Sequence, residues 1–174
     1  MIISVDELKR RINCGSDTDE VITAKLEAIE AVIRAYTNNN FQRRAARLIG
    51  HSDESYVYGV PLHFGAGDTV QITSKDGVND GLYEVVAVLD DYFELNKSIF
   101  ACDWNVVTKI EYPADVKQCA VDLYTWKQKN GDKVGVKSET ISRHSVTYED
   151  SATLYMGYPV GILNGLKLHK KVRC

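Results

Sequence analysis

The chain has 174 residues, enough for one domain with a sizeable core or for a main domain that carries a small insert. Its 44% hydrophobic and 26% charged residues are typical of a soluble globular protein and exclude disorder, a collagen helix and a disulfide scaffold. The formal net charge of -3 argues against a dedicated nucleic-acid binder, because such proteins draw most of their affinity from neutralised phosphates.

The first forty residues predict two helices. Ser4 and Glu7 have the spacing of a capping box at the start of a short first helix. A second helix over Asp17 to Thr37 has one apolar stripe, formed by Ile22, Leu26, Ile29, Ile33 and Tyr36. Its first turn is expected to contain acidic residues, which the positive helix end favours: Asp17, Asp19 and Glu20. The asparagines after Thr37 are expected to end it.

Residues 41–111 predict a small β unit. Its β-branched and aromatic stretches are "DTVQIT", "GLYEVVAV", "DYFELN" and "NVVTKIEY", separated by the turn pairs Asp76-Gly77 and Asp80-Gly81. Short strands at this spacing indicate a closed or nearly closed barrel. We expect Gly65 and Gly67 to form a turn into a strand, and the acidic pair Asp90-Asp91 to lie at a hairpin tip. Three aromatics are expected in the core, although they would also suit base stacking: Tyr83, Tyr92 and Phe93.

A third helix is predicted from Pro113 to Lys129, with Val116, Ala120 and Leu123 on its buried side, joined there by Trp126 or the stem of Lys127. An extended, polar segment follows, and a last short helix begins near Pro159. The predicted fold is therefore α+β: a small helical bundle with a β-barrel-like insertion between the second and third main helices. The helical domain takes residues 1–40 and 112–174, and the inserted β domain takes residues 41–111.

The four cysteines are far apart and contain no C-x-x-C pair, so we expect reduced thiols rather than a zinc site: Cys14, Cys102, Cys119 and Cys174. The remaining single histidines, His51, His63 and His169, lack the spacing of metal ligands, and no metal or cofactor is expected. The N-terminal stretch lacks the apolar run of a secretory signal, and no run approaches a membrane span.

The stretch "GVKSETISRHSVTYED" has the composition of a catalytic cluster. Ser142, His144 and Glu139 are its only local nucleophile, base and orienting group. In an extended chain Ser142 and His144 would share a face that Glu139 does not, and no Gly-x-Ser-x-Gly elbow is present. We therefore expect no enzyme and no catalytic residue here; local hydrogen bonding by the hydroxyls is the plainer interpretation.

Five stretches follow one another along the chain: "SVDELKRRI", "AYTNNNFQ", "GDTVQI", "NDGLYEVVAV" and "GYPVGILNGLKLHKKVR". In this order, and across essentially the whole chain, the sequence resembles the head-tail connector (adaptor) proteins of long-tailed bacteriophages. The most specific piece is Glu111 to Tyr148, in which a helix, a break and a Ser/Thr-rich segment follow in the family's order.

The resemblance implies a structural virion protein of a phage or prophage. It would form a ring, twelve-fold like the portal, that joins the portal of the filled capsid to the next connector (stopper) or a tail protein. DNA would pass through the lumen without specific binding, with no membrane involved. The protein would be assembled in the bacterial host cytoplasm and reside at the head-tail interface of the virion.

On this interpretation two segments would make contacts. The subunit or partner interface would be Lys137, Ser138, Glu139, Thr140, Ile141, Ser142, Arg143, His144, Ser145, Val146, Thr147 and Tyr148. Portal docking would use Lys167, His169, Lys170, Lys171 and Arg173, and deletion of 166–174 is expected to leave the subunit folded. Alternatives are a small-barrel nucleic-acid-binding or ligand-binding module on a helical base, and an enzyme of unknown type.

Overall fold

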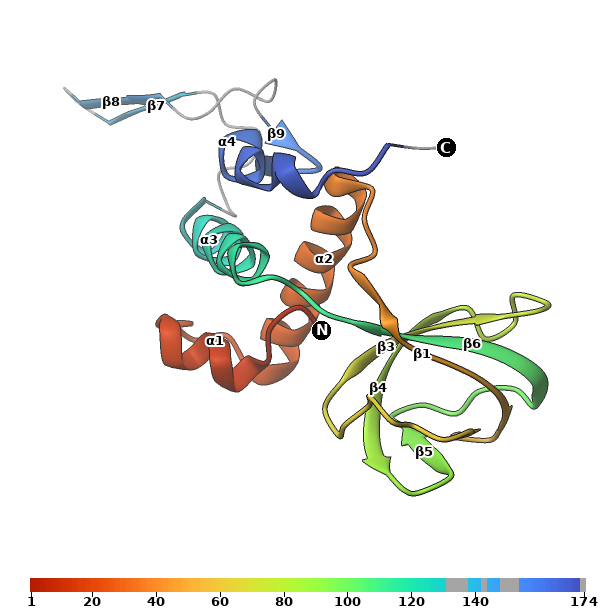
Figure 1. Ribbon diagram of the computed structural model, residues 1–174. Helices are drawn as coiled ribbons and strands as arrows, with labels where there is room; N and C mark the ends of the chain where they lie inside the picture. The colour runs from red at the N-terminus through yellow and green to blue at the C-terminus, as the bar shows by residue number, and fades with distance from the viewer. Residues whose placement is uncertain (131–137, 142–143, 148–153, 173–174) are drawn as a thin grey trace. The chain divides into compact units, whose positions relative to one another are not determined.

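The structure is a computed structural model that describes residues 1–130, 138–141, 144–147 and 154–172, and its fold is α+β (Figure 1). The chain forms two compact units. A helical unit comprises Met1–Asn39 and Tyr112–Cys174, and a barrel unit comprises Asn40–Glu111. The barrel unit is therefore an insertion in the sequence of the helical unit.

The helical unit contains four α-helices in its described residues. They are α1 (Val5–Arg11), α2 (Asp19–Thr37), α3 (Ala114–Asn130) and α4 (Val160–Leu163), and the 3₁₀ helix η3 (Asn164–His169) follows α4 directly. Two short hairpins precede α4: β7 (Ser138–Ile141) with β8 (His144–Thr147), and β9 (Leu154–Tyr155) with β10 (Tyr158–Pro159).

The predicted ends of the first two helices are set by local backbone chemistry. The Oγ of Ser4 accepts a hydrogen bond from the Glu7 amide at 3.2 Å, which confirms Ser4 as the N-cap of α1. At the far end of α2, Asn38 adopts the left-handed conformation, with φ 49° and ψ 37°. Asparagine tolerates this conformation better than most residues, so the predicted end of the helix is confirmed.

The apolar stripe of α2 is buried, as its spacing predicts. Ile22, Leu26, Ile29 and Ile33 are all 0% exposed, while Tyr36 is partly buried. The helix contacts α3, whose predicted residues Val116, Ala120 and Leu123 are buried; α3 also buries three residues that the prediction omitted: Cys119, Val121 and Tyr124. Trp126 is only partly buried.

The expectation that Asp17 lies in the first turn of α2 is wrong. The helix begins at Asp19, with the extended residue Thr18 as its N-cap. The Asp17 carboxylate instead accepts a hydrogen bond from the buried Tyr124 hydroxyl at 2.6 Å and forms an ion pair with Lys25 at 2.6 Å. Because Asp17 lies in the loop before α2, these two contacts attach the α1–α2 loop to Tyr124 of α3 and to Lys25 of α2.

This arrangement gives an expected pH dependence of stability. Hydrogen bonds from Lys25 and then Tyr124 lower the pKa of Asp17 below its usual value. A carboxyl whose pKa is lower in the folded state stabilises the fold above its unfolded pKa, and that stability is lost as the pH falls through the folded pKa. In urea unfolding, Asp17→Asn should cost about 1–2 kcal/mol at pH 7. The difference between wild type and variant should begin to shrink as the pH falls below about 4, and it should disappear only below the lowered folded pKa of Asp17. A constant difference from pH 7 to pH 2.5 would contradict this role.

The barrel unit is a closed antiparallel barrel with strand order β1-β2-β5-β4-β3-β6. Four strands confirm the predicted stretches: β3 (Thr69–Ser74), β4 (Gly81–Val88), β5 (Tyr92–Leu95) and β6 (Cys102–Ile110). The sequence did not predict β1 (Gln42–Asp53) or β2 (Tyr56–Tyr58). Closure leaves no strand of this sheet with an unpaired edge.

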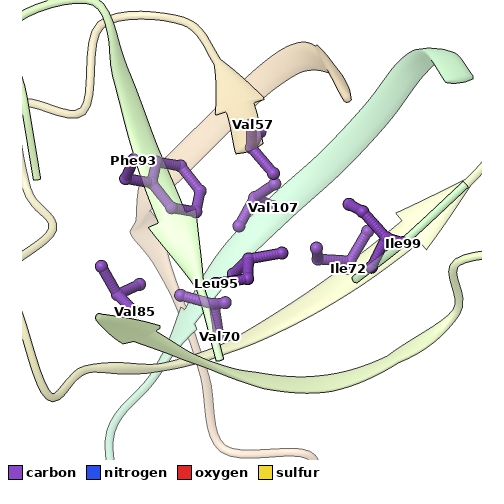
Figure 2. Close-up of a cluster of buried hydrophobic side chains, with 8 residues drawn as sticks. All are labelled: Val57, Val70, Ile72, Val85, Phe93, Leu95, Ile99 and Val107. Atoms are coloured by element: carbon purple, nitrogen blue, oxygen red, sulfur yellow. The ribbon is translucent and has the colours of Figure 1, made fainter. Parts of the chain in front are cut away.

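The barrel core is a cluster of buried apolar side chains from strands β2 to β6 and from the loop between β5 and β6, as Figure 2 shows. Its members are mostly β-branched: Val57, Val70, Ile72, Val85, Phe93, Leu95, Ile99 and Val107. Phe93 is 0% exposed and stacks on Phe64 at 5.5 Å between ring centroids, so its predicted place in the core is confirmed. Tyr83 packs against the same cluster and is partly buried. Tyr92 lies on the outer face and does not belong to this core.

A buried polar network holds the chain between β5 and β6. The side-chain amide of Asn79 donates to the Phe100 carbonyl at 2.9 Å, and its Oδ1 accepts from the Phe100 amide at 2.9 Å. The Ser52 hydroxyl donates to the same carbonyl at 2.8 Å, and Asn105 donates to Ser52 Oγ at 3.0 Å. Asn79 and Asn105 are 1% and 0% exposed, so water cannot replace these bonds.

Asn79→Ala is therefore expected to destabilise the barrel by about 2–3 kcal/mol, because it leaves the Phe100 amide without its acceptor and removes one of the two donors to the Phe100 carbonyl. Urea unfolding measured by circular dichroism checks the effect. Asn96→Ala removes a hydrogen bond to the Glu84 amide at an exposed site and should cost less than about 1 kcal/mol. Equal losses of unfolding free energy in the two variants would show that the buried network stabilises the barrel no more than an exposed hydrogen bond does.

Candidate interaction surfaces

The predicted subunit interface contains a hairpin. Strands β7 and β8 pair antiparallel, with Ser138 opposite Thr147 and Ile141 opposite His144. The predicted interface residues that lie outside the described residues are Lys137, Ser142, Arg143 and Tyr148. The others belong to the two strands: Ser138, Glu139, Thr140 and Ile141 to β7, and His144, Ser145, Val146 and Thr147 to β8. Their backbones thus form one two-stranded element.

The basic C-terminal segment is attached to the end of α2. The Lys171 amide donates to the Thr37 carbonyl at 2.8 Å. The side-chain amides of Asn38 and Asn39 donate to the carbonyls of Lys171 at 3.2 Å and His169 at 3.1 Å. The asparagines that end α2 therefore also bind the segment that the sequence assigned to docking.

Two of the predicted docking residues, His169 and Lys170, already have partners within the helical unit. His169 Nε2 lies 2.6 Å from Asp115 Oδ2, and its hydrogen bond lowers the pKa of the Asp115 carboxyl. The Lys170 ammonium lies 3.8 Å from the centre of the Tyr36 ring, a cation–π contact. Lys167 and Lys171 have exposed side chains, and Arg173 lies outside the described residues. Among the described residues of this segment, Lys167 and Lys171 therefore present their positive charges to solvent, while the Lys170 ammonium contacts the Tyr36 ring.

Deletion of 166–174 would remove one core residue, Leu166, from the described part of the segment. Leu166 is 1% exposed and belongs to the buried surface of η3, which contacts α2 and α3. A deletion that begins at Leu166 would combine loss of packing with loss of charge. Substitution of Lys167 and Lys171 separates the two effects.

The described cysteines are free thiols with different environments. Cys119 is 4% exposed, and burial, followed by the nearby Asp122 and Asp115, raises its pKa to about 12. Cys14 is also buried, whereas Cys102 is partly exposed. A buried thiol with a raised pKa is a packing residue rather than a nucleophile.

We expect iodoacetamide to modify Cys102 before Cys119 at pH 7.5. A pKa of about 12 lowers the thiolate fraction of Cys119 by roughly 10³-fold relative to an ordinary cysteine, and burial slows its reaction further. Peptide mass spectrometry over a time course measures both rates. In urea the two cysteines should react at similar rates, and rapid modification of Cys119 in the folded protein would contradict the burial.

Two open grooves adjoin each other on the helical unit. One has a volume of about 680 Å³ between α1 and α3, and the other has about 600 Å³ along residues 9–17; both include Arg11 and Ile12. Trp126 and Lys129 lie in the larger groove. No paired nucleophile and base line either groove, and the described residues contain no group of three or more His, Cys, Asp or Glu that could hold a metal ion.

The outer face of the barrel has an aromatic cluster that the sequence did not predict. His51, Tyr56, Tyr58 and Tyr92 come from β1, β2 and β5, which are neighbours in the barrel. We call these four residues the tyrosine face. Alternation in "YVY" and "YFEL" indicates outward tyrosines, but only the strand order shows that they meet.

The barrel unit is acidic overall, with eleven Asp and Glu residues and six Lys and Arg residues. Between Arg47 and Lys97 its sequence has nine Asp and Glu residues and one basic residue, Lys75. Such a balance repels phosphates and disfavours a nucleic-acid surface on this stretch of the barrel unit. None of the helices among the described residues has the length and hydropathy needed to cross a bilayer.

Gly65 and Gly67 form the predicted turn into β3. The Gly65 amide donates to Asp68 Oδ2 at 2.7 Å, and the Asp68 carboxylate forms an ion pair with Lys109 at 2.6 Å. Gly67 has a φ of 85°, a conformation that favours glycine. The Asp90-Asp91 pair lies between β4 and β5, at the predicted hairpin tip.

No protein-family model matches this chain, and no curated protein does so either.

Proposed function

We propose that this chain is a structural virion protein, a head-tail connector of the adaptor type. The observation that carries the proposal is the order of elements: two helices, an inserted β unit, a third helix, a Ser/Thr-rich segment and a short C-terminal helix. This order, together with the sequence from Glu111 to Tyr148, resembles the connector proteins of long-tailed phages. The protein joins the portal of a filled capsid to the next connector or a tail protein.

In this role the helical unit is a small bundle that forms the body of each ring subunit. The contacts of α2 with α1, α3 and η3 support this view, because four residues of its stripe, Ile22, Leu26, Ile29 and Ile33, are fully buried. The β7–β8 hairpin is the element that extends to a neighbouring subunit. The outer backbone groups of its two strands could form hydrogen bonds with a neighbouring subunit, which would offset the entropy of ordering at an interface.

A ring needs two unlike surfaces on each subunit, because a head-to-tail contact joins one patch to a different patch of the next copy. The distribution of charge supports such an arrangement. The barrel unit has an excess of Asp and Glu residues over Lys and Arg, while the end of the helical unit has the exposed residues Lys167 and Lys171. A mildly acidic ring also suits a channel through which DNA slides without binding.

The main alternative is a nucleic-acid-binding barrel on a helical base. The excess of carboxylates between Arg47 and Lys97 disfavours it. A nucleic-acid module would bind oligonucleotides with an affinity that falls steeply with salt, whereas the connector would bind the portal and show no such affinity.

The test mixes the protein with the portal protein encoded in the same genome and examines the product by electron microscopy and sedimentation. We expect an added ring with the portal's symmetry on one end of the portal. Lys167→Glu/Lys171→Glu should weaken portal binding at low salt more than at high salt, because screening removes charge attraction. The matched control Lys75→Glu/Lys97→Glu, in the barrel, should bind as wild type. Absence of any complex, together with salt-sensitive oligonucleotide binding, would refute the connector role.

A further inference from the structure

The tyrosine face is a continuous aromatic surface. Tyr58 lies opposite His51 on β1 and opposite Tyr92 on β5 in the strand register. The His51 and Tyr58 rings are stacked at 4.6 Å, and Tyr92 contacts both Tyr56 and Tyr58 at 5.6 Å between centroids. Each ring is therefore fixed by another ring, so little side-chain entropy remains to be lost when a partner binds.

The polar atoms of this surface are available. Within the described part of the chain, the hydroxyl groups of Tyr56, Tyr58 and Tyr92 make no hydrogen bond. Tyrosine with a fixed ring and a free hydroxyl is the residue type most enriched, with Trp and Arg, at the energetic centres of protein interfaces.

Carboxylates surround the rings. Asp53 and Glu94 lie directly opposite Tyr56 on its two neighbouring strands, so each is about 5 Å away at the level of Cβ. Three more lie at the adjoining turns: Glu54, Asp90 and Asp91. Among the described residues, none of these five carboxylates forms an ion pair. The closest basic residues in the sequence are Arg47, before this stretch, and Lys75 and Lys97.

We infer that the tyrosine face binds an arginine-bearing cationic segment of a partner protein. A guanidinium over the Tyr56 ring gains a cation–π contact and lies within reach of the carboxylates of Asp53 and Glu94. The free hydroxyls can accept or donate to the backbone of the same segment. The inference does not depend on the connector role, because it rests only on the barrel unit.

Other modes of recognition fit less well. Addition of a peptide strand to the sheet needs an unpaired edge, and the closed barrel offers none. Stacking of nucleic-acid bases would suit the rings, but five unpaired carboxylates would repel the phosphates. A cationic side chain can form a cation–π contact with the rings and also attract the carboxylates beside them.

The test measures binding of a fluorescent hexa-arginine peptide to the full chain by anisotropy. Asp53→Asn/Glu94→Gln should lower the affinity at least about tenfold, since two charge contacts are lost. Asp76→Asn/Glu84→Gln removes the same charge elsewhere on the barrel and should change the affinity less than about threefold. Equal losses in the two double variants would overturn the inference, because binding would then reflect net charge alone.

The aromatic contribution has its own test. Tyr56→Ala should weaken peptide binding about tenfold, whereas Tyr56→Phe, which retains the ring, should remain within about threefold of wild type. Circular dichroism of each variant confirms that the barrel is folded. Unchanged binding by a folded Tyr56→Ala, or tighter binding of an oligo-dT strand than of hexa-arginine, would overturn the inference.

Discussion

Replacement of Ile29 by aspartate is expected to unfold the helical unit. Ile29 is 0% exposed on the stripe of α2 that faces the core. A carboxylate there has no partner and must be buried without compensation or protonated, which costs about 4–5 kcal/mol or more. That is comparable to the whole stability of many domains.

The two tryptophans of the chain allow each unit to be followed separately. Trp126 lies in α3 of the helical unit and Trp104 in β6 of the barrel unit. In a Trp104→Phe background, the fluorescence of Trp126 should show an unfolded spectrum in Ile29→Asp without urea. Ala28→Asp places the same charge one residue earlier, on the exposed side of α2, and should cost less than about 1 kcal/mol. A folded Ile29→Asp would show that the stripe is not part of a core.

The helices were predictable because their information is local. The stripe of α2 repeats every three or four residues, and Ser4 and Asn38 have side chains suited to the first and last turns. Such features need no knowledge of distant contacts. The same reasoning predicted four of the six barrel strands, in which β-branched residues alternate with polar ones.

Strand β1 was not predictable in this way. Its sequence "QRRAARLIGHSD" has arginines and alanines in its first half and no clean alternation, and bulges interrupt its pairing with β6. It is a strand because β6 and β2 pair with it on both sides and close the barrel. Tertiary pairing here overrides the weak local preference.

The remaining features that the sequence did not predict depend on contacts between residues far apart in the chain. Glu30 of α2 is 5% exposed and accepts a hydrogen bond from the Tyr112 hydroxyl at 2.7 Å. It therefore adds no charge to an exposed surface. Burial, with Glu30 beside it, raises the pKa of Tyr112, so the hydroxyl remains a donor. The tyrosine face was missed for the same reason, since its residues meet only through the strand order.

Replacement of Gly50 by alanine is expected to disrupt the barrel unit. A Cβ built at Gly50 would lie 1.9 Å from the Tyr58 carbonyl oxygen, a backbone atom that cannot move without shifting β2. Glycine inside a strand often marks such a close approach of another backbone. Val57, which precedes Tyr58 in β2, belongs to the barrel core. A shift of β2 would therefore disturb the packing of the core and should cost about 3 kcal/mol or more in barrel stability.

Trp104 fluorescence in a Trp126→Phe background measures this loss in urea, and it should appear without any change in the unfolding of the helical unit. Gly65→Ala is the matched control, since its Cβ would have only an ordinary contact of 3.7 Å with Asp68 Oδ2 in the same unit. It should unfold within about 0.5–1 kcal/mol of wild type. Because β2 carries Tyr56 and Tyr58, Gly50→Ala should also weaken binding of the hexa-arginine peptide while Gly65→Ala does not. A Gly50→Ala protein of wild-type stability would mean that β1 and β2 do not approach as closely as the register requires.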